Sequence, residues 1–183
     1  MINKKTKKGF LLIELMVSMS VFTVIMLIVA GSIISVLDAN SRNQNKKIAL
    51  DNLNYVIESM SRDIRYGTTY RCSMSGDLNQ PLNCATGFYA FAFKDSNNNN
   101  IIYTSSSNKI IRSINGGSWQ DVTSNQEIII EGLYFRVVGA LPYGSDYLQP
   151  MVIVNVSGYV GSEVNTRSYF DLQFTVSQRK LDI

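Results

Sequence analysis

The chain has 183 residues, with 17 Lys or Arg, 14 Asp or Glu and no His, so its formal net charge is +3. This length fits one domain of ordinary size with an appendage. The absence of His excludes His-based catalytic triads and zinc sites that contain His. Two Cys cannot complete a four-cysteine zinc site or an all-cysteine iron–sulfur cluster. We therefore expect a protein that is not an enzyme and has no cofactor.

The positive charge is concentrated at the N-terminus. Four of the basic residues are Lys4, Lys5, Lys7 and Lys8. The rest of the chain holds 13 basic and 14 acidic residues, so it is close to neutral. Because a nucleic-acid-binding surface needs basic residues clustered on the folded domain, we expect no nucleic-acid partner.

A long apolar segment follows this basic leader. The 23 residues from Leu15 to Leu37 include no charged side chain. As a helix they would extend about 35 Å, which is enough to cross a hydrocarbon core of about 30 Å. The flanking lysines predict a single-pass protein with residues 1–8 in the cytoplasm. A cleaved secretory signal is disfavoured, because the apolar run is too long and no A-x-A site follows. A plain anchor leaves Glu14 unexplained, since a carboxylate in lipid is costly.

The residues at this junction resemble a known processing signal. The run Lys7-Lys8-Gly9-Phe10-Leu-Leu-Ile-Glu14 resembles the class III leader of type IV prepilins and type II secretion pseudopilins. The resemblance implies that a prepilin peptidase cuts between Gly9 and Phe10 and methylates the new amino group of Phe10. It also implies that Glu14 is the glutamate that the family has at its fifth mature position.

The spacing between Phe10 and Glu14 has a physical rationale. Cleavage would leave an α-ammonium group on Phe10 at the edge of an apolar helix, where an unpaired charge is costly. The carboxylate of Glu14 can pair with the amine of a neighbouring subunit when the helices pack in a filament. We therefore predict that Glu14 sets the axial register of assembly.

The helix is expected to continue far beyond the apolar segment. No Pro precedes Pro81, so nothing forces a break. Apolar residues recur at three- and four-residue steps at Leu53, Val56, Ile57, Met60 and Ile64, which predicts a helical stripe facing a sheet. After a cytoplasmic leader at residues 1–9, we predict a transmembrane or filament-core helix over 10–37 and its amphipathic continuation over 38–66, with Gly67 as a C-terminal stop. Two helices with a kink near Gly31 and Ser32 are the alternative.

Residues 67–183 are predicted to form a β-rich head. Short β-like runs alternate with turn residues, and no internal repeat is evident. The expected strands are Phe88–Phe93, Ile101–Thr104, Lys109–Ile114, Trp119–Val122, Glu127–Val138, Met151–Val160 and Arg167–Ser177. The predicted fold is therefore α+β, with a long N-terminal helix packed on an antiparallel, β-rich globular head.

Three further segments resemble one branch of the prepilin family. Ser61–Tyr66, Glu131–Arg136 and Asp171–Arg179 are similar to segments of W-type minor pilins and J-type minor pseudopilins. The resemblance implies a subunit in the tip or initiation complex of a type IV-like filament. It also implies as partners the prepilin peptidase, other minor pilins or pseudopilins, the major pilin and the assembly platform protein. The expected location is the inner or cytoplasmic membrane and then a filament at the cell surface. The alternative is that the charged residues of the first segment only solvate a helix face.

The two cysteines lie in the part expected outside the cytoplasm. A bond between Cys72 and Cys84 would close a short loop and stabilise the head by about 3 kcal/mol. Two free cysteines are the alternative, and no His is present to activate either thiol.

A weak calcium-loop pattern lies at Asp95, Asn97 and Asn99. Asn100 stands where the pattern has Gly, and Ser106 stands where it has the twelfth-position Glu. A polar turn is therefore the default interpretation, and we expect no metal.

A second class of function stays open, namely a membrane-anchored extracytoplasmic binding or adhesion module. Trp119 and the many tyrosines suggest a carbohydrate or adhesion surface, although aromatic residues at alternating strand positions more often belong to a core. A static anchor should tolerate Glu14→Ala, whereas a filament subunit should not.

Overall fold

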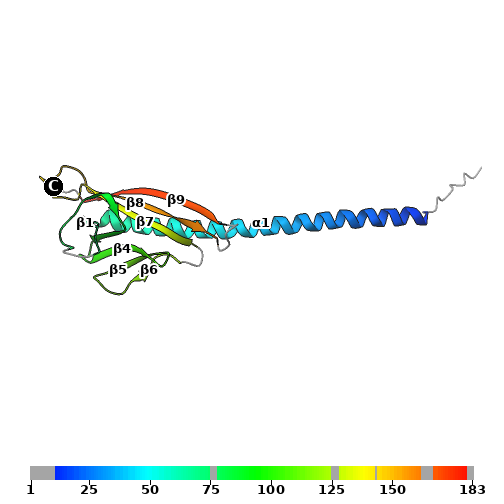
Figure 1. The fold of residues 1–183 in the computed structure, drawn as a ribbon, viewed down its shortest axis with the longest axis horizontal. Helices are drawn as coiled ribbons and strands as arrows, with labels where there is room; N and C mark the ends of the chain where they lie inside the picture. Colours follow the sequence, from blue (N-terminus) through cyan, green and yellow to red (C-terminus); the bar gives the residue numbers. More distant parts are fainter. Residues whose placement is uncertain (1–10, 75–77, 125–127, 143, 162–166, 181–183) are drawn as a thin grey trace, which may run out of the picture. The chain divides into compact units, whose positions relative to one another are not determined.

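The computed structural model describes residues 11–74, 78–124, 128–142, 144–161 and 167–180. These residues form helix α1 (Leu12–Tyr66) and two antiparallel sheets, shown in Figure 1. The chain divides into two compact units, residues 1–44 and residues 45–183, and α1 begins in the first and ends in the second. The predicted fold class, a pilin-like α+β fold, is confirmed.

Helix α1 runs without interruption from Leu12 to Tyr66, through Gly31 and Ser32. The alternative of two separate helices is therefore wrong. No Pro lies within α1, and the first Pro of the chain is 15 residues beyond its end, at Pro81.

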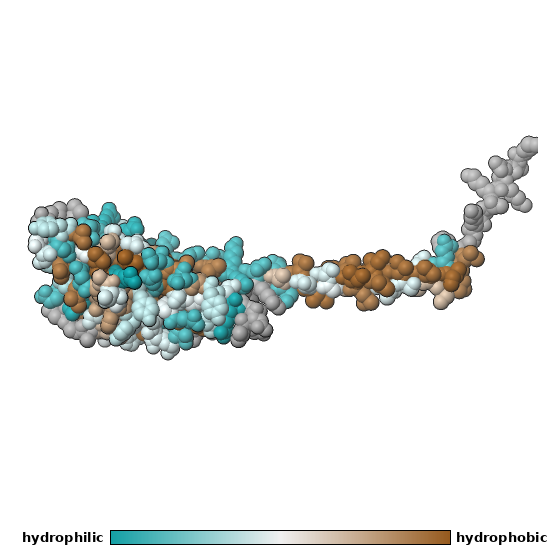
Figure 2. Space-filling view, turned by 45° about the horizontal axis from the view of Figure 1, so that its top comes forward, coloured by the Kyte–Doolittle hydropathy of each residue, from teal (hydrophilic) through white to brown (hydrophobic). Residues whose placement is uncertain are grey.

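The first unit contains the apolar part of α1. By length and composition alone, Leu12–Ser41 could cross a membrane, and none of its most apolar window is buried in the structure. Figure 2 shows the apolar side chains along this part of the helix. The hydroxyl groups of Ser18, Thr23 and Ser32 each donate to the carbonyl oxygen four residues earlier. These bonds satisfy the hydroxyls within the helix, so the segment suits surroundings that lack water.

The second unit contains the amphipathic part of α1 and both sheets. The strands are β1 (Thr68–Arg71), β2 (Cys84–Phe88), β3 (Ala90–Lys94), β4 (Asn100–Ser106), β5 (Lys109–Ile114), β6 (Gln120–Asp121), β7 (Ile128–Val138), β8 (Met151–Val160) and β9 (Ser168–Ser177). The first sheet has the order β1-β3-β4-β5-β6, and the second has the order β2-β7-β8-β9. All neighbours are antiparallel.

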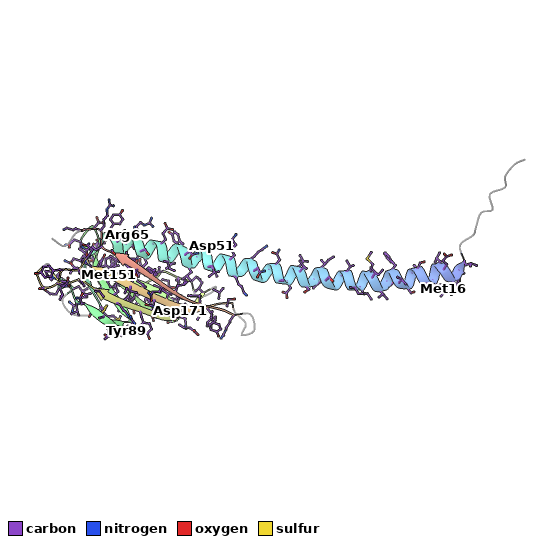
Figure 3. All side chains as sticks on the ribbon, turned by 90° about the horizontal axis from the view of Figure 1, so that it is seen from above. Met16, Asp51, Arg65, Tyr89, Met151 and Asp171 are labelled. Carbon is purple, nitrogen blue, oxygen red and sulfur yellow. A yellow bond between two sulfur atoms is a disulfide. The ribbon has the colours of Figure 1, made fainter. Side chains whose placement is uncertain are left out.

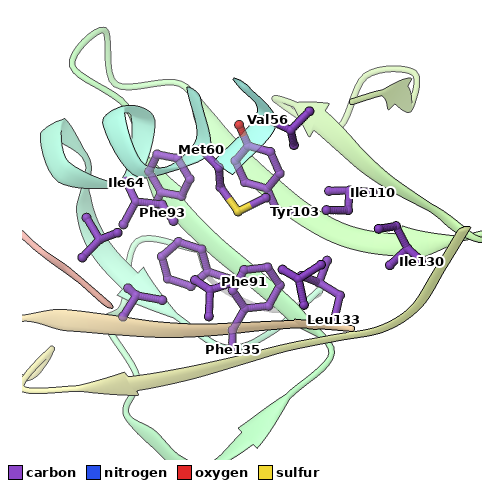
Figure 4. Close-up of a cluster of buried hydrophobic side chains, with 14 of the residues drawn as sticks. Val56, Met60, Ile64, Phe91, Phe93, Tyr103, Ile110, Ile130, Leu133 and Phe135 are labelled. Atoms are coloured by element: carbon purple, nitrogen blue, oxygen red, sulfur yellow. The ribbon is translucent and has the colours of Figure 1, made fainter. Parts of the chain in front are cut away.

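The hydrophobic core of this unit joins α1 to both sheets. The helix contributes Ala49, Leu53, Val56, Met60 and Ile64, whose spacing places them on one face. They share one cluster with Phe93 of the first sheet and Phe135 of the second. Figure 4 shows Val56, Met60 and Ile64 of this set beside the two rings. The ring of Phe91 lies 5.3 Å from that of Phe93 and 5.4 Å from that of Phe135, so stacked rings connect the two sheets. Ile57, also part of the predicted stripe, packs at the edge of the cluster and is only partly buried.

The first strands of the head differ from those that the sequence predicted. The expected strand Phe88–Phe93 is wrong, because Phe88 ends β2 in the second sheet whereas Ala90 begins β3 in the first. The chain changes sheets at Tyr89, two residues after Gly87, whose φ is +87°. β1 and most of β2 were not predicted, since both are short and lack a clear alternation. The predicted strand Trp119–Val122 is shorter in the structure, where β6 has only two residues. The bounds of the later strands agree with the prediction within a few residues.

A β-bulge in β7 explains a break in its hydrophobic alternation. Ile128 and Ile130 are buried, but the next buried residues are Leu133, Phe135 and Val137. The register with β8 shifts between Ile130 and Gly132. An extra residue in one strand moves the following side chains to the opposite face, so the bulge keeps all five apolar side chains in the core.

Candidate functional site

The described residues that the sequence singled out lie at the start of α1, at its end, and among the strands and turns of the head. Gly9 and Phe10, the expected cleavage pair, lie outside the described residues, so their processing stays a prediction. Glu14 lies in the first turn of α1, and its backbone N–H donates to the carbonyl oxygen of Leu11 over 3.0 Å. A carboxylate in the first turn interacts favourably with the helix dipole.

Along the apolar segment that the structure describes, Glu14 has no charged neighbour. Its side chain is exposed, and between Leu11 and Leu37 the sequence has no other charged residue. Ser18 donates its hydroxyl to the backbone carbonyl of Glu14 and not to the carboxylate. The arrangement presents one anionic group on an apolar helix, which can bind a cationic group of another molecule.

At the other end of α1, Asp63 connects the helix to the first sheet. The hydroxyl of Tyr103 donates to Oδ2 of Asp63 over 2.8 Å, and Nη1 of Arg112 lies 3.5 Å from the same oxygen. In Figure 4 the hydroxyl oxygen of Tyr103 points toward the helix. Burial raises the pKa of Tyr103, and the charge of Asp63 and the hydrogen bond to it raise it further. The alternative in which Asp63 only solvates a helix face is therefore wrong.

The segment Ser61–Tyr66 also contacts the segment that ends the chain. The backbone N–H of Arg179 donates to the carbonyl oxygen of Arg65 over 2.8 Å. Nη1 of Arg179 donates to the hydroxyl of Tyr66 over 2.8 Å, and its guanidinium carbon lies 5.3 Å from the centre of that ring. Carbonyls in the last turn of a helix have no partner within the helix, so Arg179 supplies one of the missing donors. Two of the three segments that resemble W- and J-type proteins thus meet at one junction.

Cys72 and Cys84 form a disulfide, and their Cα atoms lie 6.0 Å apart. Cys72 directly follows β1 and Cys84 begins β2, so the bond connects the first sheet to the second. No free cysteine is present.

The segment with the calcium-loop pattern forms the turn between β3 and β4. Asp95 accepts hydrogen bonds from the backbone N–H groups of Asn97 and Asn99, each over 2.8 Å, and from Nδ2 of Asn99 over 3.0 Å. Desolvation alone would raise the pKa of Asp95, but the hydrogen bonds from Asn99 and Asn97 lower it below its usual value. The carboxylate oxygens are thus engaged in holding the turn. Within the described ranges, no three His, Cys, Asp or Glu side chains gather in a group that could hold a metal ion.

The sequence did not reveal the partners at the helix end. Tyr103 and Arg112 lie 40 and 49 residues from Asp63 along the chain, and Arg179 lies 113 residues from Tyr66. No local pattern indicates contacts at such separations. The only hint was that Ser61–Tyr66 and Asp171–Arg179 both resembled the same proteins.

A comparison with known protein families supports the resemblance found at the N-terminus. A family model described as the prokaryotic N-terminal methylation motif matches residues 4–30, a stretch that includes Gly9, Phe10 and Glu14. No curated protein and no solved structure matches the chain significantly. The chain thus carries the N-terminal methylation motif that is typical of type IV pilins and type II secretion pseudopilins, ahead of a pilin-like α+β fold.

Proposed function

We propose that the chain is a minor pilin or minor pseudopilin, a structural subunit of a type IV-like filament. One observation carries this proposal: the methylation motif leads directly into an apolar helical segment, Leu11–Leu37, in which Glu14 is the only charged residue. Pairing of that carboxylate with the amino group of a neighbouring subunit would offset both charges when they leave water.

The topology of the precursor suggests the order of events. The precursor inserts with its basic leader in the cytoplasm, and the prepilin peptidase cuts between Gly9 and Phe10 and methylates Phe10. The mature chain then waits in the membrane until the assembly platform protein extracts it into the filament. A folded head with a charged surface cannot cross back through lipid, so extraction proceeds outward.

We assign the chain to the W/J type and place it in a tip or initiation complex with other minor subunits, above the major pilin. The junction between Ser61–Tyr66 and Asp171–Arg179 supports this assignment, since both segments resemble those proteins and each contacts the other. The absence of Pro from the sequence of α1 also supports it, because many major pilins have a helix-bending Pro there.

Mass spectrometry of the N-terminal peptide from native cells tests the proposal. Membrane and sheared-filament fractions are analysed separately, and the amount of the chain is compared with that of the main filament subunit. A peptide that begins at methylated Phe10, present in filaments in amounts far below the main subunit, is the expected result. An intact chain that retains Lys4–Lys8 and occurs only in membranes would overturn the proposal and favour a membrane-anchored binding module.

A further inference from the structure

The outer face of the second sheet has a group of side chains that assembly does not explain. β8 and β9 alternate between side chains that face the core and side chains that face away from it. We call the residues Tyr134, Asn155, Tyr159, Tyr169 and Gln173 the outer band. Tyr134 is 58% exposed and Tyr169 is 69% exposed, although both are large aromatic residues on strands. The neighbouring Asp171, labelled in Figure 3, lies on the same side of β9.

The strand register places the outer band in two rows. Tyr134 pairs with Asn155, which pairs with Gln173, and these three residues form the first row. Tyr159 pairs with Tyr169 and forms the second row. Gln173 is the fourth residue after Tyr169 on β9, so the rows lie about 14 Å apart. The ten pairs between β8 and β9 follow one another without a bulge, which keeps this surface regular.

The second row is an aromatic platform. The ring centres of Tyr159 and Tyr169 lie 5.6 Å apart at an angle of 56°. The guanidinium carbon of Arg167 lies 4.2 Å from the centre of the Tyr159 ring, so Arg167 covers that ring and holds it in place. Tyr169 is left as the exposed member of the pair.

The first row combines one aromatic ring with two amides. Nδ2 of Asn155 donates to Oε1 of Gln173 over 3.1 Å, which fixes both side chains. Each amide has a second polar atom, an acceptor at Oδ1 of Asn155 and a donor at Nε2 of Gln173. Sugar hydroxyls both donate and accept hydrogen bonds, so this fixed donor and acceptor match a pair of neighbouring hydroxyls.

The charges of this face balance, so they give no net attraction to a polyanion. In the described part of the face they are two basic residues, Arg136 and Arg167, and two acidic residues, Glu131 and Asp171. The balance is zero, whereas a polyanion needs a basic surface. A protein partner would favour an apolar centre with a polar rim, whereas here the row between the two rows of the outer band is polar, since Ser157 pairs with Asp171 there.

We propose that the outer band binds a linear, uncharged polysaccharide, an activity beyond the proposed assembly role. The apolar C–H faces of two sugar rings stack on Tyr134 and Tyr169. Hydroxyls of the sugar on Tyr134 and of its neighbours exchange hydrogen bonds with Asn155 and Gln173, which lie in the same row as Tyr134. The neutral ligand matches the neutral charge of the face.

Depletion by insoluble glycans tests this proposal. The full-length chain is kept in a zwitterionic detergent without a sugar head group and mixed with cellulose, chitin or amylose, and with polygalacturonate as the charged comparison. The wild type should bind at least one neutral glycan. Tyr134→Ala and Tyr169→Ala should each weaken that binding about tenfold, which corresponds to the loss of about 1.4 kcal/mol.

Tyr55→Ala is the matched control, because Tyr55 is 70% exposed but lies on α1. It should bind as the wild type does, and circular dichroism should show the same fold for all variants. No binding to any neutral glycan, equal binding by all variants, or binding only to polygalacturonate would overturn the proposal. Capture of a protein by the outer band with no glycan binding would overturn it as well.

Discussion

At the scale of single residues, the hydrogen bond between Tyr103 and Asp63 joins α1 to the first sheet and should stabilise the folded head. Tyr103 is 1% exposed and its hydroxyl donates to Asp63, which Arg112 also approaches. Asp63→Ala should therefore lower the free energy of unfolding by about 1–3 kcal/mol, because it leaves a buried hydroxyl without its acceptor. Tyr103→Phe should cost about 1 kcal/mol, and the double variant should cost less than the sum.

Denaturant unfolding of the full-length chain, followed by near-ultraviolet circular dichroism, measures these changes. Asp51→Ala is the control, because it removes an exposed carboxylate from the same helix. If the double variant lost as much free energy of unfolding as the two single variants together, the contact between Asp63 and Tyr103 would contribute nothing to stability.

Two buried tyrosines should make the head sensitive to alkali. Burial raises the pKa of Tyr70 and of Tyr103 above the usual value near 10. The folded state then keeps protons that the unfolded chain loses, so the stabilisation is complete below about pH 10 and declines as the pH rises further. The slope should reach about 1.4 kcal/mol per pH unit for each tyrosine. Denaturant midpoints measured up to about pH 12 should fall less steeply in Tyr70→Phe and Tyr103→Phe, and an unchanged slope in both variants would contradict this explanation.

At the scale of elements, the end of α1 depends on the absence of a side chain at Gly67. A Cβ atom there would lie 2.3 Å from Cδ2 of Phe93 and 3.1 Å from the carbonyl oxygen of Lys94. Phe93 is 2% exposed and cannot move aside easily. Gly67→Ala should therefore destabilise the head by about 1–3 kcal/mol through overpacking.

Thermal unfolding of the full-length chain measures this effect. Gly31→Ala within α1 is the control, because nothing lies within 4 Å of a Cβ at that position. Adding Phe93→Leu should recover part of the loss in the Gly67→Ala variant. A Gly67→Ala chain as stable as the wild type would mean that β3 adjusts without cost.

At the scale of the whole molecule, the proposed assembly role belongs to Glu14 near the start of α1, whereas the end of α1 packs in the head. Glu14→Ala should leave cleavage after Gly9 largely intact but reduce incorporation into filaments severalfold, since the amine of a neighbouring subunit then has no partner. Asp51→Ala should incorporate normally, because Asp51 belongs to the solvated part of α1. The measurement is the ratio of processed chain in sheared filaments to processed chain in membranes. Normal incorporation of the Glu14→Ala chain would eliminate the pairing mechanism.

The local features of this protein followed from the sequence. The helix from Leu12 to Tyr66, the strands from β4 to β9 and the apolar N-terminal segment were all predicted closely, because hydrophobic periodicity and turn residues act over short distances. The motif around Gly9, Phe10 and Glu14 was recognised for the same reason, since its residues are consecutive.

Only the tertiary structure decided the contacts between distant segments. It divided Phe88–Phe93 between two sheets, joined Asp63 to Tyr103 and Arg112, and brought Arg179 to the end of α1. It also showed that Gly67 provides room for Phe93, where the sequence indicated only a helix stop. Sequence patterns report which face of an element is apolar, whereas the choice of partners depends on how sheets pair and pack over the whole domain.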